Sequence, residues 1–302
     1  MFESLLGKKL AWRQMEALRE AKRALRGLTN GKRLTAVLLL LVQAIGCVLF
    51  DTPLSPSGEV LDLSGYELVF EDEFDGDSLD MTKWVHRGQG AAAGGYFADS
   101  QVFLENGNMV MRGEYLENGK FGPGWYAGMV KTYEDYQYGY FEMRCIPNPD
   151  NQFWSAFWLQ SNHSYTPEIS KGGVGGAEID IFESMNYNRN FLHMNAVHQT
   201  IHCSGMEDDP TNGTGLNSQS VGVFYGKSIF QEYNTYGLEW NEEEYIFYIN
   251  GVETRRTSFA DGTSKVPEQV IASICLSDEI THEKYFKTDF LVDYVRIYQK
   301  SA

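Results

Sequence analysis

The sequence is poor in cysteine and in positive charge, and most of it lacks helical periodicity. Four cysteines occur in 302 residues and none forms a CxxC pair, so a zinc site with the usual ligand spacing is not expected. Lysine and arginine number 25 against 41 acidic residues, and the net charge of −16 disfavours nucleic acid as a partner because phosphate would be repelled. With 43% hydrophobic residues and 30 glycines, the composition is typical of a globular, turn-rich protein.

The first fifty residues combine positive charge with a long uncharged stretch. Residues 1–33 carry nine basic and three acidic residues, whereas the seventeen residues 34–50 carry no charge. This length is at the short end of the ~17–25 residues usual for a transmembrane helix. We therefore expect a basic segment (1–33) in the cytoplasm and a transmembrane or signal-anchor helix (34–50) that places the rest of the chain outside.

A cleaved signal is the alternative for the same region. Met15 would then be the true start, and Ala44-Ile45-Gly46-Cys47 resembles a lipoprotein cleavage box with Ala at the position of the usual Leu. Either version exports the rest of the chain, as a membrane-anchored, secreted or lipoprotein form. Residues 51–62 contain Pro53 and Pro56 with serine and glycine, as a linker does, so the main domain is expected at 63–302.

Three cysteines fall in this main domain: Cys145, Cys203 and Cys275. A disulfide between two of them would suit an exported protein, but the sequence does not choose the pair. Buried free thiols are the favoured interpretation.

The main domain reads as a succession of short strands. Alternating apolar and polar residues, rich in aromatic and β-branched types, predict strands at 66–70, 109–111, 139–146, 153–159, 234–240, 245–249, 252–254 and 290–298. Asn250-Gly251 predicts a tight hairpin turn, because both central positions of a type I′ turn need positive φ. The pattern predicts an all-β fold, an antiparallel sandwich such as a jelly roll.

The segment Glu178-Ile179-Asp180-Ile181-Phe182-Glu183 carries three carboxylates on a predicted strand. Alternation places Glu178 and Asp180 on one face, and a β-bulge around Ile181 or Phe182 would bring Glu183 to that same face. Carboxylates this close raise one another's proton affinity, so one of them should stay protonated near neutral pH. A retaining glycosidase needs such a pair; a solvated acidic strand is the alternative.

This hexapeptide resembles the active-site motif of glycoside hydrolase family 16 in its bulged, laminarinase-like form. Further segments between residues 64 and 299 resemble the same family in the same order, among them 66–84, 138–144, 153–159, 234–240 and 292–298. The resemblance implies a β-jelly roll with a substrate cleft across its concave sheet. It also implies that Glu178 is the nucleophile, that Glu183 is the acid/base, and that Asp180 holds and tunes the pair.

Four further residues are predicted to contact the substrate: Trp154, Trp158, His198 and Trp125. Trp154 and Trp158 are four apart on one strand, so both face the same side and can stack on a sugar ring, although core packing is the alternative. Trp125 follows Gly122-Pro123-Gly124 in an expected loop at the rim of the cleft. His198 resembles the histidine of the family's neighbouring strand; a structural role is the alternative.

No cofactor and no catalytic metal are expected. The resemblance does allow a structural calcium ion, with Glu73 and Asp293 as its candidate ligands, and ordinary surface carboxylates as the alternative. The sequence departs from the family pattern at 162–176 and 276–287, where polar or charged loops would reshape the substrate subsites.

The favoured function is therefore a retaining endo-glycoside hydrolase acting on β-1,3- or mixed β-1,3/1,4-glucan, expected to be monomeric. A hydrolase or transglycosylase acting on another β-linked polysaccharide, such as a sulfated or galactose-based polymer, is one alternative, against which the acidic charge argues mildly. The other is a catalytically silent glucan-binding module, which the presence of all three carboxylates disfavours.

Overall fold

A computed structural model describes residues 58–150, 152–184, 196–206, 216–225, 228–259 and 262–301. The predicted segments 1–33 and 34–50, and most of the predicted linker, lie outside this range. Within it, none of the helices has the length and apolar character needed to cross a membrane.

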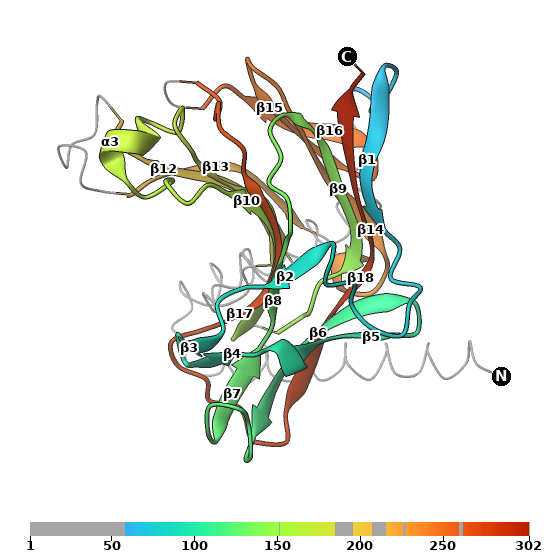
Figure 1. Ribbon diagram of the computed structural model, residues 1–302, viewed down its shortest axis with the longest axis vertical. Helices are drawn as coiled ribbons and strands as arrows, with labels where there is room; N and C mark the ends of the chain where they lie inside the picture. Colours follow the sequence, from blue (N-terminus) through green and yellow to red (C-terminus); the bar gives the residue numbers. More distant parts are fainter. Residues whose placement is uncertain are drawn as a thin grey trace, which may run out of the picture. The chain divides into compact units, whose positions relative to one another are not determined.

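Two antiparallel-rich sheets account for nearly all regular structure in the described residues (Figure 1). The first has eleven strands in the order β16 (Val252–Thr257), β15 (Tyr245–Ile249), β14 (Asn234–Trp240), β9 (Gly139–Ile146), β18 (Lys287–Lys300), β6 (Asn108–Leu116), β7 (Gly124–Ala127), β4 (Gly95–Phe97) and β3 (Gly90–Ala92), with β1 (Tyr66–Asp72) on β18 and β5 (Val102–Glu105) on β6. The second has seven, in the order β13 (Leu216–Tyr225), β12 (Ala196–Ser204), β11 (Glu178–Glu183), β10 (Phe153–Gln160), β17 (Gln269–Leu276), β8 (Met129–Thr132) and β2 (Trp84–His86). The short helices are η1 (Asp99–Gln101), α3 (Pro167–Ser170) and η4 (Ser228–Phe230).

The prediction of an all-β, two-sheet sandwich is confirmed. In the described part of the chain, β4 and β7 pair in parallel and the other paired strands are antiparallel. The hairpin at Asn250-Gly251 is confirmed too, since both residues have positive φ (52° and 73°) and Ile249 pairs with Val252 across the turn.

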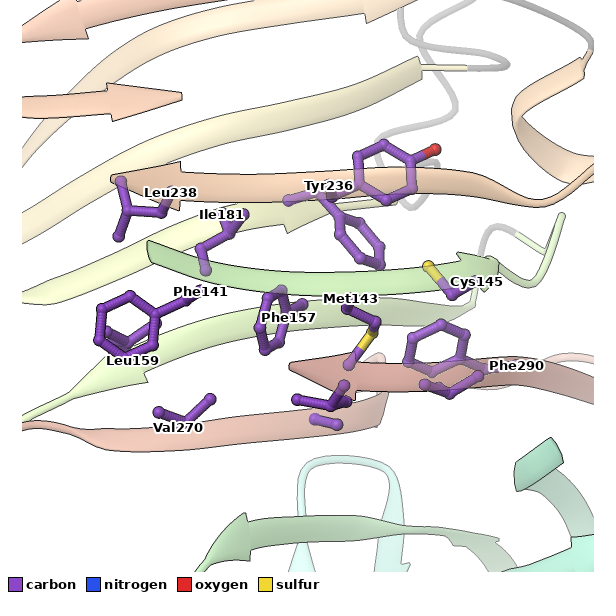
Figure 2. Packing of buried hydrophobic residues seen from close by; sticks show 14 of the residues in the cluster. Phe141, Met143, Cys145, Phe157, Leu159, Ile181, Tyr236, Leu238, Val270 and Phe290 are labelled. Atoms are coloured by element: carbon purple, nitrogen blue, oxygen red, sulfur yellow. The ribbon is translucent and has the colours of Figure 1, made fainter. Parts of the chain in front are cut away.

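The main core lies between the two sheets. Figure 2 shows Phe141 and Met143 of β9 meeting Phe157 and Leu159 of β10, all four fully buried. Phe182 of β11 packs against Tyr236 of β14 with ring centroids 4.4 Å apart. Each buried side chain of this size contributes about 1.5–3 kcal/mol through removal from water, so this layer fixes how the two sheets face each other.

The other face of the seven-stranded sheet, called the outer face below, is the face turned away from this core. Met129, Ala156, Trp158 and Ile271 form a small separate apolar cluster there. Cys145 and Cys203 are buried, and Cys275 is partly buried beside that cluster. Burial raises the pKa of Cys275 to about 12, so this thiol stays protonated at neutral pH.

Candidate active site

The six residues of β11 carry an extra residue relative to both neighbouring strands. Along β10, Phe157 pairs with Phe182 and Trp158 pairs with Asp180, so Ile181 has no partner. Along β12, the register shifts between Asp180, which pairs with Thr200, and Glu183, which pairs with His198. The predicted β-bulge is confirmed. Ile181 and Phe182 both enter the main core, and Glu183 returns to the face of Asp180.

All three carboxylates therefore lie on the outer face. Gln160 and Ala156 of β10 stand opposite Glu178 and Glu183, respectively. On the other side, His202 and His198 of β12 stand opposite the same two glutamates. Residues directly opposite each other in a sheet share a face. Strands β10 and β12 thus flank the three carboxylates on the outer face.

Asp180 and Glu183 are held in surroundings that favour their protonated forms. Asp180 is 3% exposed, and its burial, followed by the charge of Glu178, raises its pKa well above the usual value. The pKa of Glu183 is also raised well above normal, mainly by burial and then by the charges of Asp180 and Glu178. The indole Nε1 of Trp154 donates to Glu183 Oε1 over 3.2 Å and acts in the opposite direction.

Glu178 has a different set of neighbours. Its Oε2 accepts hydrogen bonds from Gln160 Nε2 and from the hydroxyl of Tyr165. Two side-chain donors from different parts of the chain therefore converge on one oxygen of this carboxylate. Arg87 in turn donates to Gln160 Oε1, and its guanidinium carbon lies 5.0 Å from the centre of the Trp158 ring.

His202 joins the site although sequence analysis assigned it no role. Its Nε2 lies 3.1 Å from Asp180 Oδ2, without the alignment of a hydrogen bond, and its Nδ1 lies 2.6 Å from Ser218 Oγ. The signal that could have found it is alternation, because His198, Thr200 and His202 are two residues apart on one strand.

One group of residues here could hold a metal ion. Donor atoms of Glu178, Asp180 and His202 lie within 4.8 Å of one another. The expectation that catalysis uses no metal stays a prediction. The proposed calcium ligands lie elsewhere and each binds an arginine: Glu73 accepts from Arg296 at 2.8 and 3.0 Å, and Asp293 pairs with Arg144. Calcium takes six to eight oxygen ligands, and these two carboxylates already bind cations, so they do not form a ready-made calcium site.

Three of the four residues predicted to contact the substrate lie on the outer face, and the fourth does not. Trp154 and Trp158 are both on the outer face; Trp154 is partly exposed, whereas Trp158 is 9% exposed and donates to Ser273 Oγ over 3.1 Å. His198 lies opposite Glu183. Trp125 is not with them.

The expected loop around Trp125 is instead strand β7, and the prediction of a loop there is wrong. Trp125 belongs to the main core, where its ring packs edge-on against Tyr115 and Phe153. The physical reason is pairing: β7 bonds to both β4 and β6, and this continuous ladder holds the tryptophan against the other sheet.

The site thus consists of three carboxylates on one face of a β sandwich, two of them with raised pKa values. The family model described as "Beta-porphyranase A-D, GH16 domain" matches residues 68–299, and the chain belongs to this family.

Individual relatives are more distant. The chain is 28% identical to β-porphyranase D of Zobellia galactanivorans over 192 residues, which cover 58% of this chain and 43% of that protein. It is 25% identical to glucan endo-1,3-β-glucosidase A1 of Niallia circulans over 227 residues, covering 66% and 30%. The chain thus spans less than half the length of either relative.

Solved structures share the fold. The crystal structure of SCLam, a non-specific endo-β-1,3(4)-glucanase from family GH16, superposes with a TM-score of 0.64 at 23% identity, covering 82% of this chain and 96% of that one. The laminarinase catalytic domain of Thermotoga maritima gives a TM-score of 0.59 at 19% identity, covering 78% and 99%. At these identities the likeness establishes the sandwich fold alone.

Proposed function

We propose that the protein is a retaining endo-glycosidase in which Glu178 is the nucleophile and Glu183 the acid/base. The observation that supports this is the bulge at Ile181, which sets both glutamates on the outer face, where burial raises the pKa of Glu183. In retaining enzymes the two carboxyl groups are about 5–5.5 Å apart, close enough for one to attack while the other donates.

In the first step a carboxylate oxygen of Glu178 attacks the anomeric carbon, and the bond from that carbon to the glycosidic oxygen breaks. Glu183 gives its proton to the departing oxygen, so the leaving chain departs as a neutral alcohol. In the second step Glu183, now ionised, takes a proton from water, and the water oxygen displaces Glu178 from the sugar. Both carboxyl groups then regain their starting forms. Transglycosylation differs only in that a sugar hydroxyl replaces the water.

Asp180 is proposed to hold the two glutamates in position and to tune their proton affinity. It is buried between the two glutamates along the strand, and any charge on it adds to the burial that raises the pKa of Glu183. Trp154, bonded to Glu183, and the neighbouring His198 are proposed to contact the sugar.

The first substrate candidate is β-1,3- or mixed β-1,3/1,4-glucan, supported by the bulged motif and by the glucanase relatives. A galactose-based, sulfated polymer is the second candidate, supported by the porphyranase family model and by Arg87, a cation placed beside the carboxylates. The net charge of −16 opposes a polyanion at long range, whereas a single well-placed guanidinium favours it locally.

Product analysis tests this proposal. The purified protein should release short oligosaccharides from laminarin or mixed-linkage glucan, or from porphyran if the second substrate is right, with agarose and xyloglucan as comparisons. Glu178→Gln should lower kcat by roughly 10⁴-fold or more, because no nucleophile remains. The surface variant Glu243→Gln is the matched control and should keep full activity.

Near-normal turnover by Glu178→Gln would sink the assignment of the nucleophile. A folded wild-type protein that yields no product from any of the five polymers would contradict these substrate classes and favour a binding role.

A further inference from the structure

The connection from β10 to β11, residues 161–177, is tied firmly to the adjoining strand β12. Ser164 is fully buried; its hydroxyl donates to Ser161 O, and its own carbonyl accepts from Ser204 Oγ, each over 2.9 Å. Ser170 is also fully buried and donates to Gly176 O over 2.8 Å. Gly172 N donates to Ser204 O over 2.8 Å. The loop is therefore a built structure whose side chains are held in place.

Tyr165 follows the buried Ser164 in this loop and reaches the proposed nucleophile. Its hydroxyl donates to Glu178 Oε2, while 51% of the residue's surface stays exposed. Partial burial of the hydroxyl and the nearby charge of Glu178 both raise the pKa of Tyr165, so the phenol remains a neutral donor throughout the pH range of the enzyme.

The second donor to the same oxygen comes from a different element. Gln160, at the end of β10, donates through Nε2, and its amide is oriented by Arg87, which donates to Gln160 Oε1. With two donors on Oε2, the carboxylate plane of Glu178 is fixed. Among the described residues, Oε1 has no hydrogen-bond donor, so this oxygen is the one available for attack.

We propose that Tyr165 is a positioning residue for Glu178 and that its exposed ring borders the sugar being attacked. The inference rests on the proposed role of Glu178 and extends it to the loop 161–177. The hydroxyl holds Oε2 in both chemical steps: it orients the carboxylate for attack, and it stabilises the charge that returns to Glu178 when water displaces it. The ring, carried by this loop, forms a wall at the site.

Two substitutions separate these roles. Tyr165→Phe keeps the ring and removes the donor, so kcat should fall about 10-fold or more, the value of a hydrogen bond to a charged group, while KM stays within about 2-fold of wild type. Tyr165→Ala removes both and should also raise KM several-fold. Tyr133→Phe is the matched control: Tyr133 is 62% exposed, and no hydrogen bond of its hydroxyl is present among the described residues, so its kcat and KM should equal those of wild type.

The outcomes separate this inference from the function on which it depends. A Tyr165→Phe variant with wild-type kcat overturns the role of the hydroxyl, and a Tyr165→Ala variant with wild-type KM overturns the role of the ring. Either result leaves the proposed function standing if Glu178→Gln is inactive. Near-normal activity of Glu178→Gln removes the proposed function itself. Because Tyr165 is exposed, thermal unfolding of both variants should match wild type, and this measurement shows that a fall in kcat does not come from misfolding.

Discussion

Two glutamates on one strand acquire different chemistry from their immediate neighbours. Glu178 is bound at one oxygen by two donors, Gln160 and Tyr165, whereas Glu183 accepts a hydrogen bond from the indole of Trp154. Burial then dominates at Glu183 and raises its pKa, which keeps a proton available for the leaving oxygen. The proposed division of labour between nucleophile and acid thus rests on hydrogen-bond supply and on burial, and not on residue type.

Trp154→Phe tests how the hydrogen bond from the indole affects the pKa of Glu183. The indole N–H stabilises the ionised form, so removing it should raise the pKa of Glu183 further. The enzyme is active while Glu183 is protonated and loses activity as the pH rises through that pKa. The basic limb of the kcat/KM profile should therefore move to higher pH.

Trp158→Phe is the matched control for this shift, because its indole donates to Ser273 and not to a carboxylate. Its basic limb should coincide with that of wild type. If the basic limb of Trp154→Phe stays in place or moves to lower pH, the hydrogen bond from Trp154 to Glu183 does not have the role given to it.

At the scale of elements, the site is a property of strand pairing. The bulge in β11 turns Glu183 to the outer face, and β12 supplies His198 and His202 by register. The loop 161–177 is fixed to β12 through Ser204, so the strand that borders the carboxylates also anchors Tyr165. Strand and loop are therefore mechanically coupled at the proposed nucleophile.

Ser204→Ala should loosen this loop without changing the strand ladder. The residue is 4% exposed, and the substitution leaves the carbonyl of Ser164 without its donor, at a cost of about 1–2 kcal/mol. Trypsin should then cut after the exposed Lys171 several-fold faster than in wild type, since local opening becomes more frequent. The exposed Ser100→Ala is the control and should be cut at the wild-type rate; equal rates in both variants would show that Ser204 does not anchor the loop.

At the scale of the whole molecule, the chain is acidic and also buries an acid that is not one of the three carboxylates of β11. Glu268 has no exposed surface; its Oε1 accepts from Ala177 N over 3.1 Å and from Ser264 Oγ over 2.6 Å. Burial raises the pKa of Glu268 to about 8 from a usual value of 4.5. The folded state therefore holds this proton more tightly than the unfolded chain does.

This raised pKa makes stability depend on pH in a definite direction. The stabilisation is fully present below about pH 4.5 and is lost progressively as the pH rises to about 8. Glu268→Gln stays neutral, so its free energy of unfolding relative to wild type should increase between pH 5 and pH 9, by an amount on the order of a few kcal/mol. The pKa values of Asp180 and Glu183 are also raised, but both residues are present in wild type and in Glu268→Gln. Their contributions therefore cancel in the difference between the two free energies of unfolding.

Chemical denaturation at several pH values measures this difference. Glu243→Gln, at an exposed position, should show no such trend. A constant difference between Glu268→Gln and wild type across the range would mean that Glu268 is already ionised when the protein is folded. The predicted export of the domain through residues 34–50 stays a prediction, because these residues lie outside the described range.

The sequence by itself determined the fold class and the core of the site. Alternation of apolar and polar residues specifies strands locally, and the Asn-Gly pair specifies a turn through its own backbone preferences. The spacing of Glu178, Asp180 and Glu183 on one strand required a bulge for all three to share a face, and the register confirmed it. These features depend on neighbours only a few residues away.

Only the tertiary structure decided which other residues meet the carboxylates. Arg87 and Gln160 lie 73 positions apart, and Tyr165 reaches Glu178 from a loop whose course is set by buried serines on two elements. His202 lies at the site because the register of β11 and β12 places it opposite Glu178. Trp125 lies in the main core because β7 pairs with β4 on one side and with β6 on the other. Contacts of this kind depend on long-range strand pairing and on packing between sheets, for which a local pattern of residues carries no information.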